Sequence, residues 1–234
     1  MIEDLQELEN KINNLLKNRK DIRILEAGCG SMSHIQFSQD AYLIGVDISS
    51  EQLERNKLLH ERFLHDIQDA NFPVSGFDLI VCWDVLEHLP KPRHAISNFL
   101  KIIKEDGYVL LASPNVMSLR GLITKFTPHW FHVWFYRNIY GLKNAGKNGH
   151  GPFKSFHKFS ISPEVLKKFA QGNNLSIEFF KTYEIEHPEK NNKQFKIIWD
   201  LANTITKIIS LGSIGTDKDE GFIMVLSKNP KKLI

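Results

Sequence analysis

The sequence has few cysteines, no long apolar run and no signal-like N-terminus. Its 234 residues include two cysteines, Cys29 and Cys82, both within apolar runs, so we expect buried free thiols of a reducing compartment rather than a disulfide framework. No stretch reaches about 18 uninterrupted apolar residues, so no membrane-spanning helix is expected. The charged first twenty residues lack the apolar region of a signal peptide. These absences predict a cytoplasmic protein.

Charge and composition are ordinary for a globular protein. Apolar residues make up 42 % and charged residues 24 %, which is enough to build a core without metal or disulfides. The net charge of +3 is too mild to favour nucleic acid as the partner. The length suits one sizeable domain, or a domain with an elaborate insertion. The sequence leaves the oligomeric state open.

Strand and helix patterns alternate through most of the chain. Leu5, Leu8 and Ile12 lie at helical spacing in an amphipathic first helix over 3–19. Strands are expected within 21–30, 41–49, 62–67, 77–83, 108–115, 175–185 and 221–228. Helices are expected over 31–39, 50–61, 93–107, 162–173 and 192–212. Ser49 or Ser50 and then Ser162 are the predicted N-caps, and Gly107 is a predicted stop. The alternation predicts a doubly wound α/β fold with a mostly parallel sheet and helices on both faces.

Polar residues and glycines gather where the first strands end, which is where such sheets bind ligands. Gly28 and Gly30 follow the first strand and let the backbone turn close to a ligand. Asp47 ends the second strand, 21 residues after Glu26, where a carboxylate accepts hydrogen bonds from ribose hydroxyls. Glycines follow many strands, and an acid after a strand is often a helix N-cap. The recurrence on successive strands favours a binding site.

The third and fourth strands continue the pattern. Asp66 follows the third strand and is placed to accept from an adenine amine, with Ile48 and Ile67 as apolar faces for the ring. The fourth strand ends in CWDVLEHL, which combines Trp83 with two acids and a histidine.

Together these motifs resemble those of a known enzyme family. ILEAGCG, GVDIS, HDI, FDLIVCWDVLEHLPKP and IIKEDGYVLLASPN look like the successive motifs of class I S-adenosylmethionine-dependent methyltransferases. The subgroup that includes ubiquinone-biosynthesis O-methyltransferases is the most similar. The resemblance covers about residues 20–116 and, more weakly, 155–182. It implies a Rossmann-like sheet of seven strands with a lid insertion after strand five, and S-adenosyl-L-methionine as cofactor.

The resemblance also implies roles for individual residues. Glu26, Gly28 and Gly30 would line the methionine part of the cofactor, and Asp47 would hold the ribose. Asp66 with Ile67 would meet the adenine, and Trp83 would lie beside the cofactor. Where the family has a third glycine, this sequence has Met32, so the next helix is expected to begin differently. An NAD-dependent dehydrogenase is disfavoured because the spacing G-x-G-x-x-G fails at Ser33.

A hydroxyl acceptor benefits from a general base, and histidine suits neutral pH. His88 is the first candidate, with His157 and His129 next; His132 and His150 are further alternatives. Each histidine could instead have a purely structural role. Glu87 and His88, for example, could simply cap or anchor the following helix. Asp84, Glu87 and His88 also resemble the metal-binding cluster of some RNA 2′-O-methyltransferases, but the first acid is shortened, and we expect no metal.

The segment after the fifth strand is aromatic and basic. Residues 127–141, TPHWFHVWFYRNIYG, hold six aromatic residues other than histidine, and no acid lies between Asp106 and Glu164. We expect a substrate wall here, formed by Trp130, Trp134, Tyr136 and Arg137. A hairpin packed on the sheet edge is the plainer alternative. The basic charge suggests an acceptor that is anionic or glycosylated. Alternatively, the segment could rest on an anionic membrane surface.

The expected organisation is therefore an N-terminal helix (1–20), a cofactor-binding core (21–115), a lid (116–160) and a C-terminal part of the core (161–234) with a helical insertion near 192–211. The leading function is O-methylation of a small-molecule natural product, phenol or sugar. The alternatives are N-methylation of a small amine, methylation of RNA or protein, and a non-enzymatic cofactor-binding partner subunit.

Overall fold

The computed structural model describes residues 2–35, 37, 40–147, 151–185 and 193–228. The strands are β1 (Ile22–Ala27), β2 (Ala41–Asp47), β3 (Glu61–Leu64), β4 (Phe77–Trp83), β5 (Ile103–Pro114), β6 (Ser176–Tyr183) and β7 (Gly221–Ser227). The α-helices are α1 (Ile2–Leu16), α2 (Ser50–Arg55), α3 (Pro92–Ile102), α4 (Leu119–Phe126), α5 (His129–Asn138), α6 (Pro163–Gly172) and α7 (Lys193–Ile209). Short 3₁₀ turns are η1 (Leu86–His88), η2 (Phe159–Ile161) and η4 (Asp217–Asp219).

The strands form one seven-stranded sheet in the order β3-β2-β1-β4-β5-β7-β6. The pairs from β3 to β5 are parallel, and β7 is antiparallel to both β5 and β6. This confirms the mostly parallel, doubly wound sheet. The strand order reverses between β1 and β4, so the carboxyl ends of these two strands flank the switch point at which such folds bind ligands.

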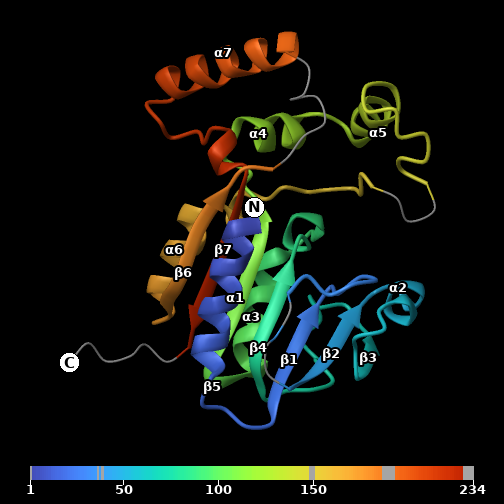
Figure 1. Cartoon of the computed structure of the whole chain (residues 1–234), viewed down its shortest axis with the longest axis vertical. Coiled ribbons are helices and arrows are strands. Elements are labelled where there is room, and N and C mark those ends of the chain that lie inside the picture. Colours follow the sequence, from blue (N-terminus) through green and yellow to red (C-terminus); the bar gives the residue numbers. More distant parts are fainter. Residues whose placement is uncertain (1, 36, 38–39, 148–150, 186–192, 229–234) are drawn as a thin grey trace.

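Helices cover both faces of the sheet (Figure 1). On one face, Leu8, Ile12 and Leu16 of α1 pack against Leu79 and Val225 of the central strands. On the other face, α3 and α6 contribute to a larger cluster whose fully buried members include Phe77, Phe99 and Phe222. The central strands are apolar on both sides for this reason, as β4 and β7 show by their continuous burial. Cys29 and Cys82 are buried free thiols, as expected.

One predicted helix is absent from the described residues, and two others end earlier than predicted. The described residues of 31–39 are turns and bends, because this serine-rich stretch has no apolar stripe to hold a helix against the sheet. α2 ends at Arg55 rather than residue 61, since buried Asn56 adopts an extended conformation. α3 ends at Ile102, five residues before Gly107, because Ile103 already pairs with Phe77 at the start of β5. A long apolar run is compatible with either a helix or a strand. Here the last residues of the run pair with β4 and belong to strand β5.

The segments that interrupt the strand–helix alternation lie beyond the carboxyl ends of the parallel strands (Figure 1). α4 and α5 follow β5, and α7 lies between β6 and β7. Ser118 is the N-cap of α4, and its hydroxyl accepts the Gly121 N–H; a bridge between Ser118 and Gly215 ties this turn to the segment after α7. Both interruptions therefore gather over the same end of the sheet.

Candidate functional site

The turn after β1 depends on a glycine. Gly28 has a φ of +73°, and a Cβ atom there would lie 2.6 Å from the Val85 side chain. Any larger residue would therefore be both strained and crowded. The N–H of Gly30 donates to Asp47 Oδ2 at 3.0 Å, which links this turn to the end of β2.

Asp47 holds the loop rather than capping the helix that follows. Its Oδ1 accepts the Ser49 N–H at 2.9 Å, while its Oδ2 accepts that of Gly30. Ser49 is the N-cap of α2, and its hydroxyl accepts the Gln52 N–H. The predicted serine cap is confirmed, and the Asp47 carboxylate is fixed at the switch point with the β1 turn.

Glu26 lies under this turn with one carboxylate oxygen unused. Its side chain is buried; Oε2 accepts from the Ser33 hydroxyl at 2.5 Å, and Oε1 has no hydrogen-bond partner in the described part of the chain. Burial raises the pKa of Glu26, and the Ser33 hydrogen bond opposes that rise. A buried acceptor without a donor is costly unless a ligand supplies one.

A narrow pocket surrounds this free oxygen. Its lining consists of Glu26, Ala27, Gly28, Cys29, Met32, His34, Val81 and Trp83. The His34 ring stacks on the Trp83 indole, with centroids 5.6 Å apart and planes 6° apart, and burial lowers the pKa of His34. Ser33 and His34 were not predicted as site residues, because their loop has no motif of its own beyond a departure from the glycine pattern at Met32.

The predicted adenine contacts lie at the next strand ends. The Asp66 carboxylate accepts from the backbone N–H and the side-chain amide of Gln68. Ile48 is 77 % exposed just beyond β2, so its side chain offers an apolar face, whereas Ile67 is buried in the core. Any role of these three residues in binding stays a prediction.

Near the end of β4, the ionisable side chains of Asp84, Glu87 and Tyr183 interact electrostatically. Glu87 is buried, and its pKa is raised to about 8 by burial and by the nearby Asp84 charge, although the Ser113 hydroxyl donates to it at 3.1 Å. The Asp84 side chain reaches solvent, but protein encloses it on most sides, which raises its pKa to about 6. Burial and the two acids also raise the pKa of Tyr183 at the end of β6. No sequence signal placed Ser113 or Tyr183 here, because they come from distant strands.

His88 has a defined hydrogen-bonding state. Its Nδ1 lies 3.0 Å from the Lys154 carbonyl oxygen, which can only accept, so the neutral ring carries its proton on Nδ1 and its lone pair on Nε2. Burial lowers the pKa of His88, and the Lys154 carbonyl opposes this. Nε2 lies 3.8 Å from Glu87 Oε1, and the side chain keeps 31 % of its surface exposed. The ring is thus neutral near pH 7 and partly accessible.

The returning end of the insertion lies directly over this histidine. The N–H groups of Phe156 and His157 both donate to the Glu87 carbonyl, and the Phe153 ring meets the His88 ring edge-on at 6.0 Å. His157 is buried, its φ is +40°, and its Nδ1 has no partner among the described residues. Burial and the neighbouring His88, His132 and Lys125 lower the pKa of His157 to about 4.

His129 belongs to the same end of the molecule. Its ring meets the His132 ring at 6.4 Å, and His132 in turn contacts the Thr127 hydroxyl through Nε2 at 2.6 Å. The structure therefore brings three of the predicted histidines, His88, His157 and His132, near one another, with His129 beside the last. His150 falls outside the described residues.

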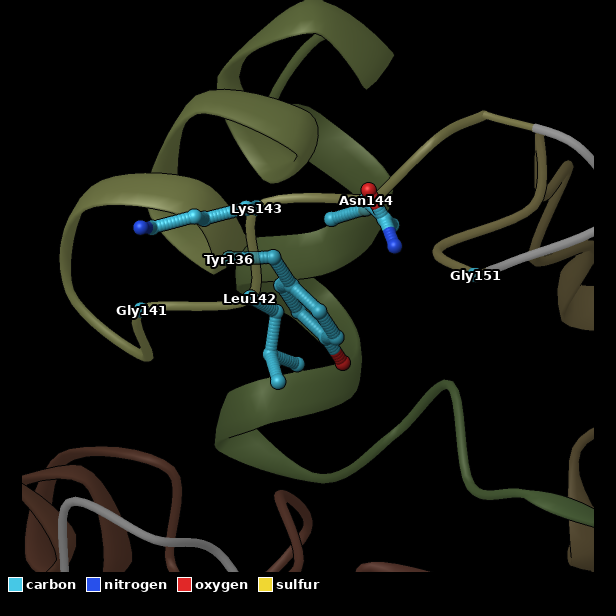
Figure 2. A pocket seen from close by; sticks show the side chains of 7 residues that line it. Tyr136, Gly141, Leu142, Lys143, Asn144 and Gly151 are labelled. Carbon is cyan, nitrogen blue, oxygen red and sulfur yellow. The ribbon is translucent and has the colours of Figure 1, made fainter.

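The four residues predicted to form a substrate wall have different surroundings in the structure. Trp130 and Trp134 are 69 % and 48 % exposed on α5, which buries none of its residues. Arg137 donates twice to the Ala145 carbonyl and so shapes the following loop. Tyr136 and Leu142 point the same way at a cavity of about 470 Å³ within the insertion (Figure 2), which has the volume of a small-molecule site. The rest of its lining is Gly141, Lys143, Asn144, Ala145 and Gly151.

No group of three histidine, cysteine or acidic side chains in the part of the chain that the structure describes is arranged to hold a metal ion. The Asp84–Glu87–His88 cluster therefore gains no support as a metal site. Among the same residues, no helix combines the length and apolar character needed to cross a membrane.

Comparisons with known proteins give related chains. A family model described as a methyltransferase domain matches residues 1–178. A ubiquinone biosynthesis O-methyltransferase of Glaesserella parasuis is 30 % identical over 187 residues, covering 72 % of this chain and 71 % of that protein. An uncharacterized protein of Methanocaldococcus jannaschii is 33 % identical over 112 residues, covering 47 % of this chain and 49 % of that protein, so this chain spans about half the length of that relative. The structure of the plantazolicin methyltransferase BpumL in complex with SAH shares the fold, with a TM-score of 0.54 and 13 % identity over 96 % of this chain and 82 % of that one.

Proposed function

Since this chain belongs to the methyltransferase-domain family and is a class I S-adenosylmethionine-dependent methyltransferase, we propose that it methylates a hydroxyl group of a small molecule, with His88 as the general base. The observation that carries the proposal is the state of His88. A neutral imidazole with its lone pair on Nε2, at the carboxyl end of β4, is a base ready to take a hydroxyl proton.

The residues around the β1 turn fit the cofactor. The unpaired Oε1 of Glu26 is an acceptor of the kind that an ammonium group would satisfy, and Gly28 leaves the backbone open where a Cβ atom could not fit. The Gly30 N–H holds Asp47 beside this turn, and Trp83 lines the same pocket as Glu26 and Gly28. When bound, S-adenosylmethionine supplies an electrophilic methyl group. Glu26 and Asp47 would hold the cofactor, and Trp83 would lie beside it and restrict its position.

The chain's own contribution to the reaction is positioning and proton transfer. The Lys154 carbonyl, which belongs to the insertion, fixes the His88 tautomer and ties the base to the segment that covers it. Glu87, kept largely protonated by burial, places no full negative charge beside His88. His88 would therefore remain neutral until it accepts the acceptor's proton on Nε2, and would release that proton to solvent through its exposed edge.

The insertion supports a small acceptor. It carries aromatic side chains, basic residues and the 470 Å³ cavity, and it returns to His88 through the Lys154 carbonyl. Aromatic walls with a few polar groups are typical of small-molecule sites. The acid-free stretch between Asp106 and Glu164 favours an acceptor that carries negative charge.

The test follows a labelled methyl group from the cofactor into an extract of the source cells. We expect label in a small molecule, as an ether that resists mild base. The His88→Gln variant should bind the cofactor normally but transfer about 100- to 10,000-fold more slowly. The matched control is His94→Gln, at an exposed position of α3, which should keep full activity.

Three results would contradict the proposal. Full activity of His88→Gln with label on nitrogen would identify an amine acceptor, which needs no base. Label in material that nuclease or protease releases would replace the small molecule with RNA or protein. Cofactor binding without transfer to any acceptor would instead favour a non-enzymatic partner subunit.

A further inference from the structure

The helix α7 presents an unusual surface to solvent. Its exposed aliphatic side chains are Ile197 (68 %), Leu201 (59 %), Ile205 (46 %), Ile208 (69 %) and Ile209 (77 %). Their spacing of three and four residues places them on one face of the helix. Leu211, just beyond the helix, is 95 % exposed. We call these six residues the α7 stripe. Single exposed aliphatic residues are common, but a continuous row of them marks an interaction surface.

The opposite side of α7 is attached to the protein, which fixes the outward direction of the stripe. Trp199 lies under the Arg120 guanidinium at 4.3 Å, and Asn203 is buried. Arg120 also pairs with the buried Glu220 at 2.8 Å. Trp199 and Asn203 are four residues apart and so share the inward face. The stripe is therefore not a core face turned the wrong way, since the helix already has an inward side.

The position of α7 leaves the stripe accessible. Figure 1 shows α7 as the outermost element at the end of the molecule where α4 and α5 also lie. Exposed apolar side chains continue on those two helices: Phe126 is 74 % exposed and Trp130 is 69 % exposed. This is also the end beyond the carboxyl ends of the parallel strands.

Charge distinguishes among the surfaces that could cover the stripe. Lys196 and Lys207 are exposed on α7, with Asp200 as the acid between them. The neighbouring insertion holds seven basic residues, and no acid lies between Asp106 and Glu164. A second copy of this chain would bring the same positive charges opposite these. An anionic lipid surface would attract them and accept the apolar side chains.

We propose that α7 lies in the interface of an anionic membrane, with the α7 stripe facing the acyl chains and the lysines at the level of the headgroups. This goes beyond the methylation chemistry and does not depend on the acceptor. Such docking would bring the open end of the methyltransferase to a surface from which apolar acceptors can enter.

The experiment measures binding of the full chain to vesicles by flotation, without cofactor or acceptor. The probes are phosphatidylcholine vesicles and vesicles with about 40 % phosphatidylglycerol, each at low and high salt. We expect binding to the anionic vesicles that weakens with salt, because exposed charges are screened. The triple variant Leu201→Ser/Ile205→Ser/Ile208→Ser should partition at least about tenfold less, since apolar burial drives insertion.

A matched control carries the same change elsewhere. Leu58, Leu64 and Ile177 are exposed aliphatic residues outside α7, and their triple serine variant should bind vesicles as the unchanged protein does. Thermal melting of both variants shows that each is folded. The proposal is overturned if the unchanged protein ignores anionic vesicles, or if the α7 variant binds as well as the control. It is also overturned if the unchanged protein is a dimer that the α7 variant splits, because the stripe would then bind a second copy.

Discussion

The substitution Glu87→Gln removes an ionisable group that the fold buries, while keeping its shape. The glutamine carbonyl can still accept the hydrogen bond that Ser113 donates to Glu87. Burial and the Asp84 charge raise the pKa of Glu87 from 4.5 to about 8, so the folded state resists its ionisation. Glutamine cannot ionise, and the variant therefore escapes this penalty.

The sign and size of the effect follow from linkage between protonation and folding. Below pH 4.5 the carboxyl is protonated in both states and the folded protein suffers no loss. As the pH rises towards 8, the unfolded chain releases the proton first, and the stability of the unchanged protein falls. Each pH unit between the two pKa values is worth about 1.4 kcal/mol, which gives up to about 5 kcal/mol by pH 9.

Thermal denaturation at pH 5 and pH 9 measures this. Glu87→Gln should melt close to the unchanged protein at pH 5 and clearly above it at pH 9. Even a third of the full effect corresponds to roughly 3–6 °C for a chain of this size. The control Glu164→Gln, at a side chain that is 75 % exposed beside Lys167, should show no such pH dependence. An equal melting difference at both pH values would refute the reasoning.

Three further predictions concern the site and its support. Gly28→Ala should lower stability by at least about 2 kcal/mol in denaturant titrations, because of its positive φ and the contact with Val85, whereas Gly172→Ala, with open space around it, should not. Asp47→Asn should weaken cofactor binding at least about tenfold in calorimetry, since the amide cannot accept from both backbone N–H groups; unchanged affinity would contradict its role. The pH–rate profile should have an acidic limb below the ordinary histidine pKa of 6.5, in keeping with the lowered pKa of His88, and that limb should vanish in His88→Gln.

Local patterns predicted which residues lie together at the ends of β1 and β2. Glu26, Gly28 and Asp47 each stand at a fixed place at the end of a strand, and parallel strands bring those places together. Their role in cofactor binding stays a prediction. The loop from Ser31 onward could not be predicted in the same way. The His34 ring packs on Trp83 across 49 positions of sequence, and no local sequence pattern predicts this contact.

The insertion shows the same division. Its aromatic and basic character was evident, and its return to His88 agrees with the expectation that it would emerge over the strand ends. Yet two of the four predicted wall residues, Trp130 and Trp134, stand well exposed on α5, and Arg137 shapes a loop. Composition tells which side chains a segment carries, but the direction of each depends on how its helix meets the rest of the protein.

The sequence by itself determined the sheet, its connections and the cofactor class, because alternating strands and helices of this length pack in few ways and the strand ends carry local motifs. Only the tertiary structure decided the state of the polar cluster. Burial and the nearby Asp84 raise the pKa of Glu87, the Lys154 carbonyl fixes the tautomer of His88, and Arg120 holds α7 so that its isoleucines face outward. These properties depend on distances between residues far apart in the chain, and a pattern in the sequence does not contain them.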